Sequence, residues 1–492
     1  MNCVVLGAGI AGLVAALELQ KRGVQVTVIE AAPLPGGRTC SWLTPSGLET
    51  GTGLHVVADH YTNLLDVLAS VDALGEIVWW NEHSYLRPGE SAVLWRYNRL
   101  PAPFHLLNPA VAMPLVLRSK FRFLHASLDA ARYRQEDLHL LDDISYLEWH
   151  NRHKLGQGFI LDLAVLAADA ATFLPLQKAA ARPVLSWLKY MSRSSQAGRI
   201  GTWRRPLSEG LIAPLANALK KLGGTIRTST EAVLIRVEGN AVRGVIVRDS
   251  RQTSPKYQAR GEYAEQEPEQ MLHCDTLISA LPVQALKRLL DSDTAERAGL
   301  TAALTLTTVP AISVVIRFDR KLHPSPPGAP LVTGCMIRDL IDLSEFRDSL
   351  PESVIQFLVS RSEKWMGESD DRIISAVARD FRVLWPPAIE AKVVDAAVER
   401  ILSAMFAAHP GSHRLRPLTE TKIPNFFLAG DWVRHDLNAS MEGAALSGRL
   451  AARAVLRTEN RDGVPLLRPD EPLVNRALQF LARPSPALCR VA

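Results

Sequence analysis

The chain opens with the pattern of hydrophobic and polar positions that is typical of a βαβ unit. Residues 3–6 form a short apolar run, residues 13–21 follow a helical pattern that stops before Gly23, and residues 24–29 form a second apolar run. Continuous β-branched runs of this length are typical of parallel strands that are buried on both faces. The pattern therefore predicts a strand, a helix and a second strand of a parallel sheet.

Beyond this unit the pattern changes several times. Residues 61–204 carry Leu, Ala, Trp and Phe at helical spacing, which predicts a mostly helical insertion. Residues 206–224 predict a helix that ends at a glycine pair, and the alternation over residues 225–247 predicts antiparallel strands. Residues 248–273 are polar, and we expect a surface loop or a disordered insert there.

The last third of the chain mixes strand and helix periods. Residues 311–318 predict a strand, whereas residues 371–385 and 389–407 predict amphipathic helices. A further strand is expected at residues 426–429, followed by a helix of small residues at 440–456. Strands and helices in this arrangement indicate an α/β fold.

Composition excludes several classes of function. Hydrophobic residues make up 47% and charged residues 22%, as in an ordinary globular protein. The net charge of 56 − 51 = +5 is mild and no charge run is present, so no nucleic-acid partner is expected. The 5 cysteines are scattered without a C-x-x-C pair, so we expect neither a metal site nor a disulfide framework. No apolar run reaches the roughly 18 residues of a transmembrane helix.

A glycine pattern separates the first strand from the helix. Gly7, Gly9, Ala11 and Gly12 belong to a G-x-G-x-x-G turn. The first glycine allows the tight turn, the second lets the backbone approach a pyrophosphate, and the third lets helix and strand pack closely. Glu30 ends the second strand 18 residues after Gly12, at the distance expected for an acceptor of ribose hydroxyl groups. The segment predicts a dinucleotide site, with a glycine turn that binds no ligand as the alternative.

The residues that follow favour FAD over NAD. Gly36, Gly37 and Arg38 resemble the glycine-glycine-arginine extension of the flavin amine oxidase and carotene desaturase superfamily. Two glycines let the chain pass close to the cofactor, and the guanidinium can reach a phosphate or neighbouring backbone. The alternative is a surface loop. The resemblance continues through a segment implied to lie near the flavin, which contains Gly53, Leu54 and His55.

The C-terminal region carries a second motif. A strand ends in Ala-Gly430-Asp431, and a helix begins at Ser-Met441-Glu442-Gly. Together they resemble the plant and cyanobacterial phytoene and ζ-carotene desaturases. Asp431 can bind the ribitol or bridge to the pyrophosphate, and the positive end of the helix would stabilise charge on reduced flavin. Alternatively, Glu442 is an acid favourable to its own helix. The resemblance also implies a cofactor contact at Val233.

These motifs define the expected domain organisation. A chain of 492 residues is too long for one hydrophobic core, so several domains are expected. We expect an α/β fold with a Rossmann-type FAD-binding domain and a discontinuous, largely helical α+β substrate domain. The expected boundaries are 1–60, 205–290 and 415–460 for the FAD domain, 61–204 and 291–414 for the substrate domain, and 461–492 for a C-terminal tail.

The resemblance covers roughly residues 2–456, and it has departures. Glu209 is followed by a glycine where plant-type phytoene desaturases have an arginine. Trp432 replaces a tyrosine, and Arg434 replaces a lysine. The bacterial hydroxysqualene dehydroxylases are similar too, because they share the aspartate–tryptophan pair and the following glutamate–glycine.

The resemblance implies an FAD-dependent oxidoreductase that acts on a long isoprenoid hydrocarbon, as a carotene- or phytoene-type desaturase does. A hydride would pass to the flavin and the adjacent carbon would lose a proton. Because a polyene spreads the charge, no strong base is required; Glu442, His55 and Glu209 are candidates, each with a structural role as the alternative. The rival hypotheses are a hydroxysqualene dehydroxylase-like enzyme, a flavin amine oxidase and a non-enzymatic FAD-holding protein. A quinone is a candidate electron acceptor.

Two apolar blocks bear on the substrate. Residues 159–176 predict the lining of a long apolar cavity, with a plain helical core as the alternative. Residues 100–124 join an apolar run to Arg118, Lys120 and Arg122, which predicts attachment to an anionic membrane surface. The alternative there is a buried segment. A strand that begins at Asn2 leaves no room for a signal peptide, so we expect a cytoplasmic, peripherally membrane-associated protein.

Overall fold

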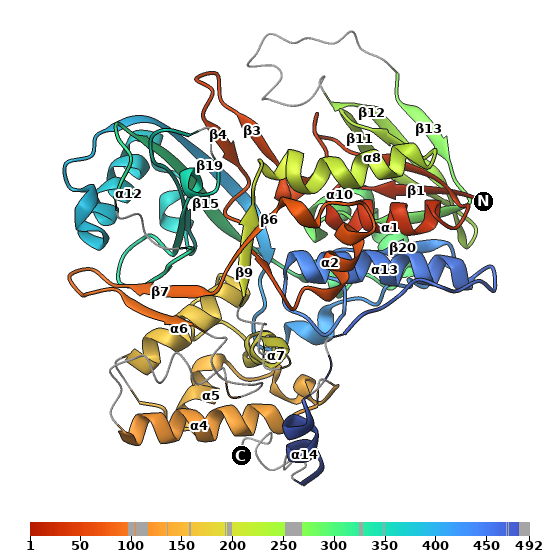
Figure 1. The fold of residues 1–492 in the computed structure, drawn as a ribbon. Helices are drawn as coiled ribbons and strands as arrows, with labels where there is room; N and C mark the ends of the chain where they lie inside the picture. The colour runs from red at the N-terminus through yellow and green to blue at the C-terminus, as the bar shows by residue number, and fades with distance from the viewer. Residues whose placement is uncertain are drawn as a thin grey trace.

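A parallel β-sheet assembled from distant parts of the chain organises the first domain (Figure 1). Its order is β10-β2-β1-β14-β20, and every neighbouring pair is parallel. The strands are β1 (Asn2–Leu6), β2 (Gln25–Ile29), β10 (Thr225–Arg227), β14 (Thr276–Ser279) and β20 (Phe426–Leu428). This sheet confirms the α/β fold class and the N-terminal βαβ unit.

The computed structural model describes most of the chain. The described residues are 1–96, 104, 117–134, 136–156, 159–191, 193, 199–250, 268–323, 328–347, 350–468, 470 and 472–481.

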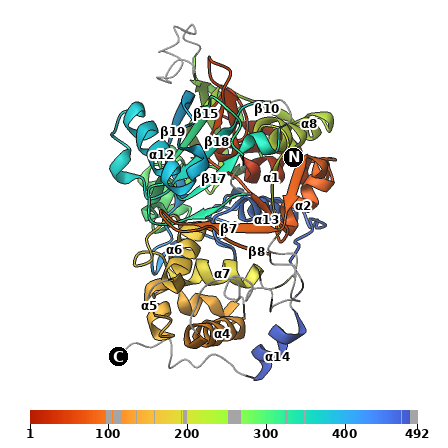
Figure 2. The same ribbon diagram turned by 60° about the vertical axis from the view of Figure 1, so that its left-hand side comes forward.

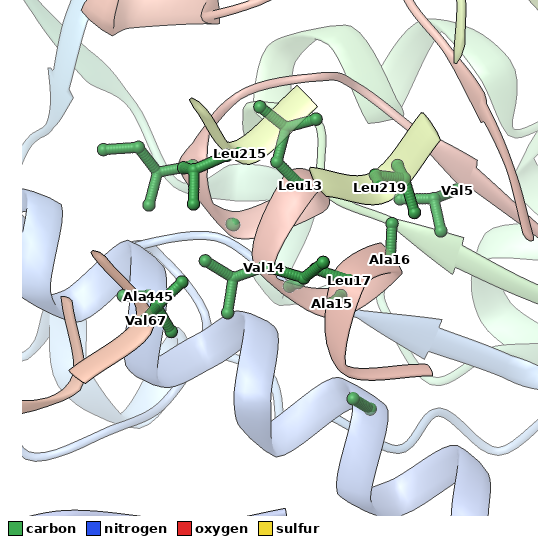
Figure 3. Close-up of a cluster of buried hydrophobic side chains, with 14 of the residues drawn as sticks. Val5, Leu13, Val14, Ala15, Ala16, Leu17, Val67, Leu215, Leu219 and Ala445 are labelled. Carbon is green, nitrogen blue, oxygen red and sulfur yellow. The ribbon is translucent and has the colours of Figure 1, made fainter. Parts of the chain in front are cut away.

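Helices from the N-terminal, middle and C-terminal parts of the chain belong to the same domain as the parallel sheet. They are α1 (Ile10–Gln20), α2 (Thr62–Ala69), α8 (Ala213–Lys221), α10 (Val283–Leu289), α11 (Ser292–Arg297) and α13 (Met441–Arg457). The helix α1 is apolar all round because it packs against β1, β2, α8 and α13 (Figure 3). A Cβ on Gly448 of α13 would lie 2.4 Å from the carbonyl oxygen of Ala11, so glycine sets the close approach of α1 and α13.

A small antiparallel sheet extends the same domain. It contains β11 (Thr230–Glu238), β12 (Ala241–Asp249) and β13 (Gln270–His273). The first two strands confirm the predicted antiparallel pair, whose turn uses Gly239 at φ +57°. The start of the predicted segment, residues 225–227, is instead the parallel strand β10. Of the polar stretch at 248–273, residues 251–267 lie outside the described residues, and the last four residues form β13 rather than a loop.

A 7-stranded sheet forms the centre of the second domain, in the order β19-β15-β18-β17-β16-β7-β8. The strands are β7 (Glu82–Leu86), β8 (Val93–Arg96), β15 (Thr308–Phe318), β16 (Leu331–Val332), β17 (Asp339–Asp342), β18 (Val354–Val359) and β19 (Val393–Phe406). The predicted helix at 371–385 is confirmed as α12 (Asp370–Leu384). The predicted helix at 389–407 is wrong, because that segment pairs along the whole of β15 as β19.

The helical part of the second domain lies at one end of the molecule (Figure 1 and Figure 2). It contains α4 (Leu117–Arg132), α5 (Tyr146–Arg152), α6 (Phe159–Thr172) and α7 (Ala181–Met191), with α14 (Leu473–Leu481) packed against α4. Residues 61–204 are thus only partly helical. They also supply β7, β8, β6 (Ile77–Trp80) and β9 (Ile200–Trp203), and the latter two join β5 (Val57–Ala58) in a small sheet.

Candidate cofactor and substrate site

The glycine turn after β1 is shaped by steric limits at each glycine. Gly7 adopts φ +96°, and a Cβ on Gly12 would lie 1.9 Å from the carbonyl oxygen of Gly7. Gly9 is the N-cap of α1. Within 4 Å, a Cβ on Gly9 would have one neighbour among the described residues, the carbonyl oxygen of Gly36 at 3.8 Å. The helix N-terminus therefore faces open space that fits a pyrophosphate and that a larger residue at Gly9 would fill.

The carboxylate of Glu30 lies beside this glycine turn. Its two oxygens accept hydrogen bonds from the backbone N–H groups of Ala8, at 2.8 Å, and Ala32, at 2.9 Å. Burial raises the pKa of Glu30, and these hydrogen bonds oppose the shift. The carboxylate is thus fixed at the end of β2, beside the position of a cofactor ribose in dinucleotide-binding folds.

The segment after Glu30 folds back onto the glycine turn. Gly36 forms a parallel bridge with Gly9, and its N–H donates to the carbonyl oxygen of Ala8 at 2.8 Å. Gly36 adopts φ +130° and Gly37 adopts φ +55°, conformations that side chains rarely tolerate. The two glycines therefore carry the chain directly beside the expected pyrophosphate position.

Arg38 and Asp431 join the N-terminal and C-terminal motifs. The guanidinium donates two hydrogen bonds to the carboxylate, at 2.7 and 3.1 Å, and a third to the carbonyl oxygen of Ala404 at 3.0 Å. Asp431 follows Gly430 just after β20. It lies at the carboxyl ends of the parallel strands, where the glycine turn and Glu30 also lie. Dinucleotides cross parallel sheets at this edge, so the arrangement fits FAD.

Arg416 holds the loop that contains Asp431, a role that sequence analysis missed. Its buried guanidinium donates hydrogen bonds to backbone carbonyl oxygens of residues 431, 432, 433, 435 and 437 and lies 5.0 Å from the ring centre of Phe406. Burial and the neighbouring Arg182 lower the pKa of Arg416 to about 9. The Arg-Pro pair at Arg416 was the only available signal, and its partners are visible only in the fold.

The two candidate residues at the start of α13 differ in their surroundings. Met441 is buried in the core around α1. The carboxylate of Glu442 accepts hydrogen bonds from the N–H and side-chain amide of Asn63, at 3.0 and 2.8 Å, and from the N–H of Leu64 at 2.9 Å. It therefore binds the first turn of α2 rather than its own helix. Burial raises the pKa of Glu442.

The remaining candidates come from two segments of the chain, residues 53–55 and the strand β11. Gly53 adopts φ +112°, and the Nδ1 atom of His55 lies 2.9 Å from the Gly53 carbonyl oxygen. Burial lowers the pKa of His55, which favours neutral imidazole. Leu54 packs against the cluster around Val315 in β15. Val233 lies at a β-bulge of β11, away from this segment in the fold.

A small pocket, with about 20 Å³ of room for water-sized molecules, is lined both by this segment and by strands of the 7-stranded sheet. Its lining includes Gly53, His55 and Val315. It also contains an ion pair between Arg347 and Glu49, which are 2.9 Å apart. The two residues lie 298 positions apart in the sequence, and the pattern gave no signal that they meet.

The cavity lining at residues 159–176 stays a prediction, and several positions of this block belong to the alternative, a helical core. Ala164, Ala168 and Ala171 of α6 lie in the helical core with α7, which was the alternative. Asp169 is 1% exposed and pairs with Arg338 at 3.0 Å. Asp169 thus ties α6 to the residue that precedes β17, and the other charged position of this block, Asp162, pairs with Arg87 at 3.2 Å.

Most of the segment predicted to contact a membrane, 100–124, lies outside the described residues. Its C-terminal end begins α4, where Arg118 is exposed and Phe121 is 63% exposed. Among the described residues, no helix combines the length and apolar character that crossing a membrane requires.

Comparison with known proteins agrees with this geometry. Residues 10–456 match the family model of flavin containing amine oxidoreductases. The chain is 25% identical over 477 residues to the 15-cis-phytoene desaturase of Solanum lycopersicum, covering 93% of this chain and 78% of that protein. It is 25% identical over 490 residues to a probable zeta-carotene desaturase of Synechococcus elongatus, covering 93% and 99%.

A solved structure of an oxidoreductase from Methanosarcina mazei has the same fold. It superposes with a TM-score of 0.68 at 18% identity, over 93% of this chain and all of that one. At this identity the likeness concerns the fold alone.

Proposed function

Since the chain belongs to the flavin containing amine oxidoreductases, and is thus an FAD-dependent oxidoreductase, we propose that it acts on a long isoprenoid hydrocarbon as a carotene-type desaturase. The observation that carries this proposal is the similarity to phytoene and ζ-carotene desaturases over 93% of the chain. FAD supplies a hydride acceptor for such a reaction. We propose a quinone as the terminal electron acceptor.

The contacts described above support specific roles in binding FAD. The N-terminus of α1 at Gly9 would hold the pyrophosphate, and Glu30 would accept hydrogen bonds from a ribose. Asp431, fixed by Arg38, would meet the ribitol or pyrophosphate. All of these groups lie at the carboxyl ends of parallel strands, where one extended ligand reaches them together.

The candidate bases support a desaturation that needs no strong side-chain base. Glu442 is occupied by hydrogen bonds from α2. The pKa of His55 is lowered by burial, so imidazole there is a weak base. An allylic cation delocalised over a polyene would lose its proton readily, and an isoprenoid substrate therefore suits these residues.

Attachment to a membrane surface is part of the proposal, because a long isoprenoid is almost insoluble in water. The helices α4 and α14 lie together at one end of the molecule (Figure 2). They expose Phe121, Leu473 and Phe480, at 63%, 80% and 85%. Aromatic and aliphatic side chains beside Arg118 suit insertion at an anionic lipid surface.

A second candidate function is favoured by the pocket beside Gly53. The ion pair between Arg347 and Glu49 lines this pocket. A purely hydrocarbon substrate would offer no polar group to these two side chains. A hydroxysqualene dehydroxylase-like enzyme acts on an isoprenoid that carries a hydroxyl group, and it would use such a pocket.

One experiment separates these candidates. Purified holoprotein with oxidised flavin is mixed without oxygen with phytoene or an amine in lipid vesicles. Holoprotein whose flavin has first been reduced with dithionite is mixed with hydroxysqualene, because replacing a hydroxyl group by hydrogen consumes two electrons. The flavin absorbance and products are followed in each case. Bleaching of the flavin by phytoene, with a new conjugated double bond in the product, is the result expected of a desaturase. Reduction by an amine alone would overturn the isoprenoid proposal.

A further inference from the structure

Asp339 places a carboxylate on the face of the 7-stranded sheet that is turned away from α12. It begins β17, and the strand register pairs it with Leu358 of β18. The next residue, Leu340, packs in the cluster that contains the apolar side of α12, so the side chain of Asp339 lies on the opposite face. Leu358 shares that face, and its Cδ1 atom lies 4.0 Å from where a Cβ on Gly53 would be. Asp339 therefore belongs to the face that meets the Gly53 segment.

This position is close to the segment expected beside the flavin. Ile341 lines the small pocket together with Gly53 and His55. Asp339 precedes Ile341 by two positions on the same face, a distance of about 7 Å along a strand. The paired positions on the neighbouring strands hold Leu358 and Leu331, which are both apolar. Asp339 is thus an acid in an apolar wall, next to the expected site of hydride transfer.

No cation neutralises this carboxylate within the described part of the chain. Its Oδ1 atom accepts a hydrogen bond from the N–H of Leu340 at 2.9 Å. Arg338, the nearest guanidinium in sequence, pairs instead with Asp169 of α6 at 3.0 Å, and Arg361 pairs with Asp169 at 3.2 Å. The side chain of Asp339 is half-buried, so it can meet a ligand. A positively charged group in the substrate would supply the partner that the fold does not.

The surroundings of Asp339 also suit proton transfer. Burial raises the pKa of Asp339 to about 7, Arg338 and the N–H of Leu340 oppose the rise, and Asp169 adds to it. A group with a pKa near neutral pH can accept a proton during a reaction and release it afterwards. Such a weak base is sufficient for an allylic cation, which loses a proton readily.

We propose that Asp339 is a catalytic residue, which stabilises positive charge on the substrate and accepts the proton that desaturation releases. The proposal rests on the proposed isoprenoid function and adds the proton acceptor to it. One carbon of the substrate gives up a hydride to FAD, and the neighbouring carbon gives its proton to the Asp339 carboxylate. The electron pair of that second C–H bond becomes the new double bond.

A charged probe tests the carboxylate without turnover. Farnesyltrimethylammonium carries a fixed positive charge on an isoprenoid chain, and farnesene is its neutral counterpart. Their binding to FAD-loaded protein in nonionic micelles is followed by the change in the flavin spectrum. At about pH 8, Asp339→Asn should bind the cation about tenfold more weakly than wild type and should bind farnesene equally well. The difference should disappear as the pH falls through about 7, because the protonated carboxyl of wild type carries no charge.

Reaction with phytoene tests the proton transfer. In Asp339→Asn, reduction of the flavin by phytoene should be slower by about 100-fold or more, while the FAD content stays at the wild-type level. Asp339→Glu keeps the charge and should recover much of both the rate and the binding of the cation. Asp380→Asn is the matched control, because Asp380 lies on α12, at the other face of the sheet, and accepts a hydrogen bond from the N–H of Met336 at 3.1 Å. This variant should behave as wild type does.

The outcomes separate this assignment from the proposed function. If Asp339→Asn reacts with phytoene as fast as wild type, or binds the cation as tightly, the assignment is wrong, while oxidation of phytoene by wild type keeps the isoprenoid function. If wild type that retains FAD does not oxidise phytoene, the isoprenoid function fails and the assigned proton transfer falls with it.

Discussion

Arg38 and Asp431 form a two-point ion pair although they are 393 positions apart in the sequence. The pair joins the loop after β2 to the end of β20, the strand at one edge of the parallel sheet. The N-terminal and C-terminal motifs are therefore one structure, and each depends on the other for its position.

Asp431→Asn should release FAD more easily than wild type does. The amide keeps the shape of the side chain but loses the charge that orients Arg38. Because the Arg38 side chain is one-third exposed, the free energy of unfolding should fall by only about 1 kcal/mol. The FAD content after gel filtration measures the release of FAD, and the melting temperature measures the change in stability. Asp395→Asn, which alters a half-buried carboxylate that accepts a hydrogen bond from Ser46, is the control and should change neither.

Arg416→Met should destabilise the fold more strongly. The substitution leaves five carbonyl oxygens of the Asp431 loop without their donor. Hydrogen bonds to a charged group contribute about 1.5–3 kcal/mol each, so a loss of at least about 3 kcal/mol in the free energy of unfolding is expected. Urea unfolding with FAD in excess measures it. Arg434→Met removes two bonds to carbonyls outside this loop and should cost less.

His413 should make the fold sensitive to mild acid. Burial, then the nearby Arg182, lowers the pKa of His413 to about 2, so the folded state takes up no proton there near neutral pH. The unfolded imidazole binds a proton below about pH 6.5, and stability is therefore lost as the pH falls below that value. In the His413→Gln variant, the free energy of unfolding should fall less steeply with decreasing pH, by about 1 kcal/mol per pH unit between pH 6.5 and 5.

Chemical denaturation across that pH range measures the change in slope. His323→Gln, at an exposed position, serves as the control. An unchanged slope in the His413 variant would mean that the imidazole is solvated in the folded protein.

The sequence predicts the cofactor domain better than the substrate domain, for a physical reason. The strand, glycine turn and helix of residues 2–20 depend on neighbours close in sequence, so periodicity and glycine spacing reveal them. The strand β19 carries a helical pattern, and only pairing with β15 makes it extended. Likewise, nothing local indicates that Arg347 meets Glu49.

The last prediction concerns the membrane surface proposed at α4 and α14. Replacing Phe121 and Phe480 by Ser removes two exposed aromatic side chains from this end of the molecule. Each should contribute about 1.5–3 kcal/mol when buried in lipid, so flotation with anionic vesicles should fall sharply at low and high salt alike. Charge reversal at Arg118 changes the charge by two units and should instead weaken membrane binding by about 2 kcal/mol, and only at low salt.

Ile389→Ser is the matched control for this effect. Ile389 is 69% exposed and lies shortly after α12, a helix that Figure 1 shows well apart from α14. If membrane contact is confined to α4 and α14, this variant floats as wild type does, because its apolar side chain never meets lipid. Equal losses in Ile389→Ser and the double Phe variant would indicate nonspecific adsorption instead. Wild type that never floats would leave the protein without a route to a bilayer substrate and would favour a soluble one.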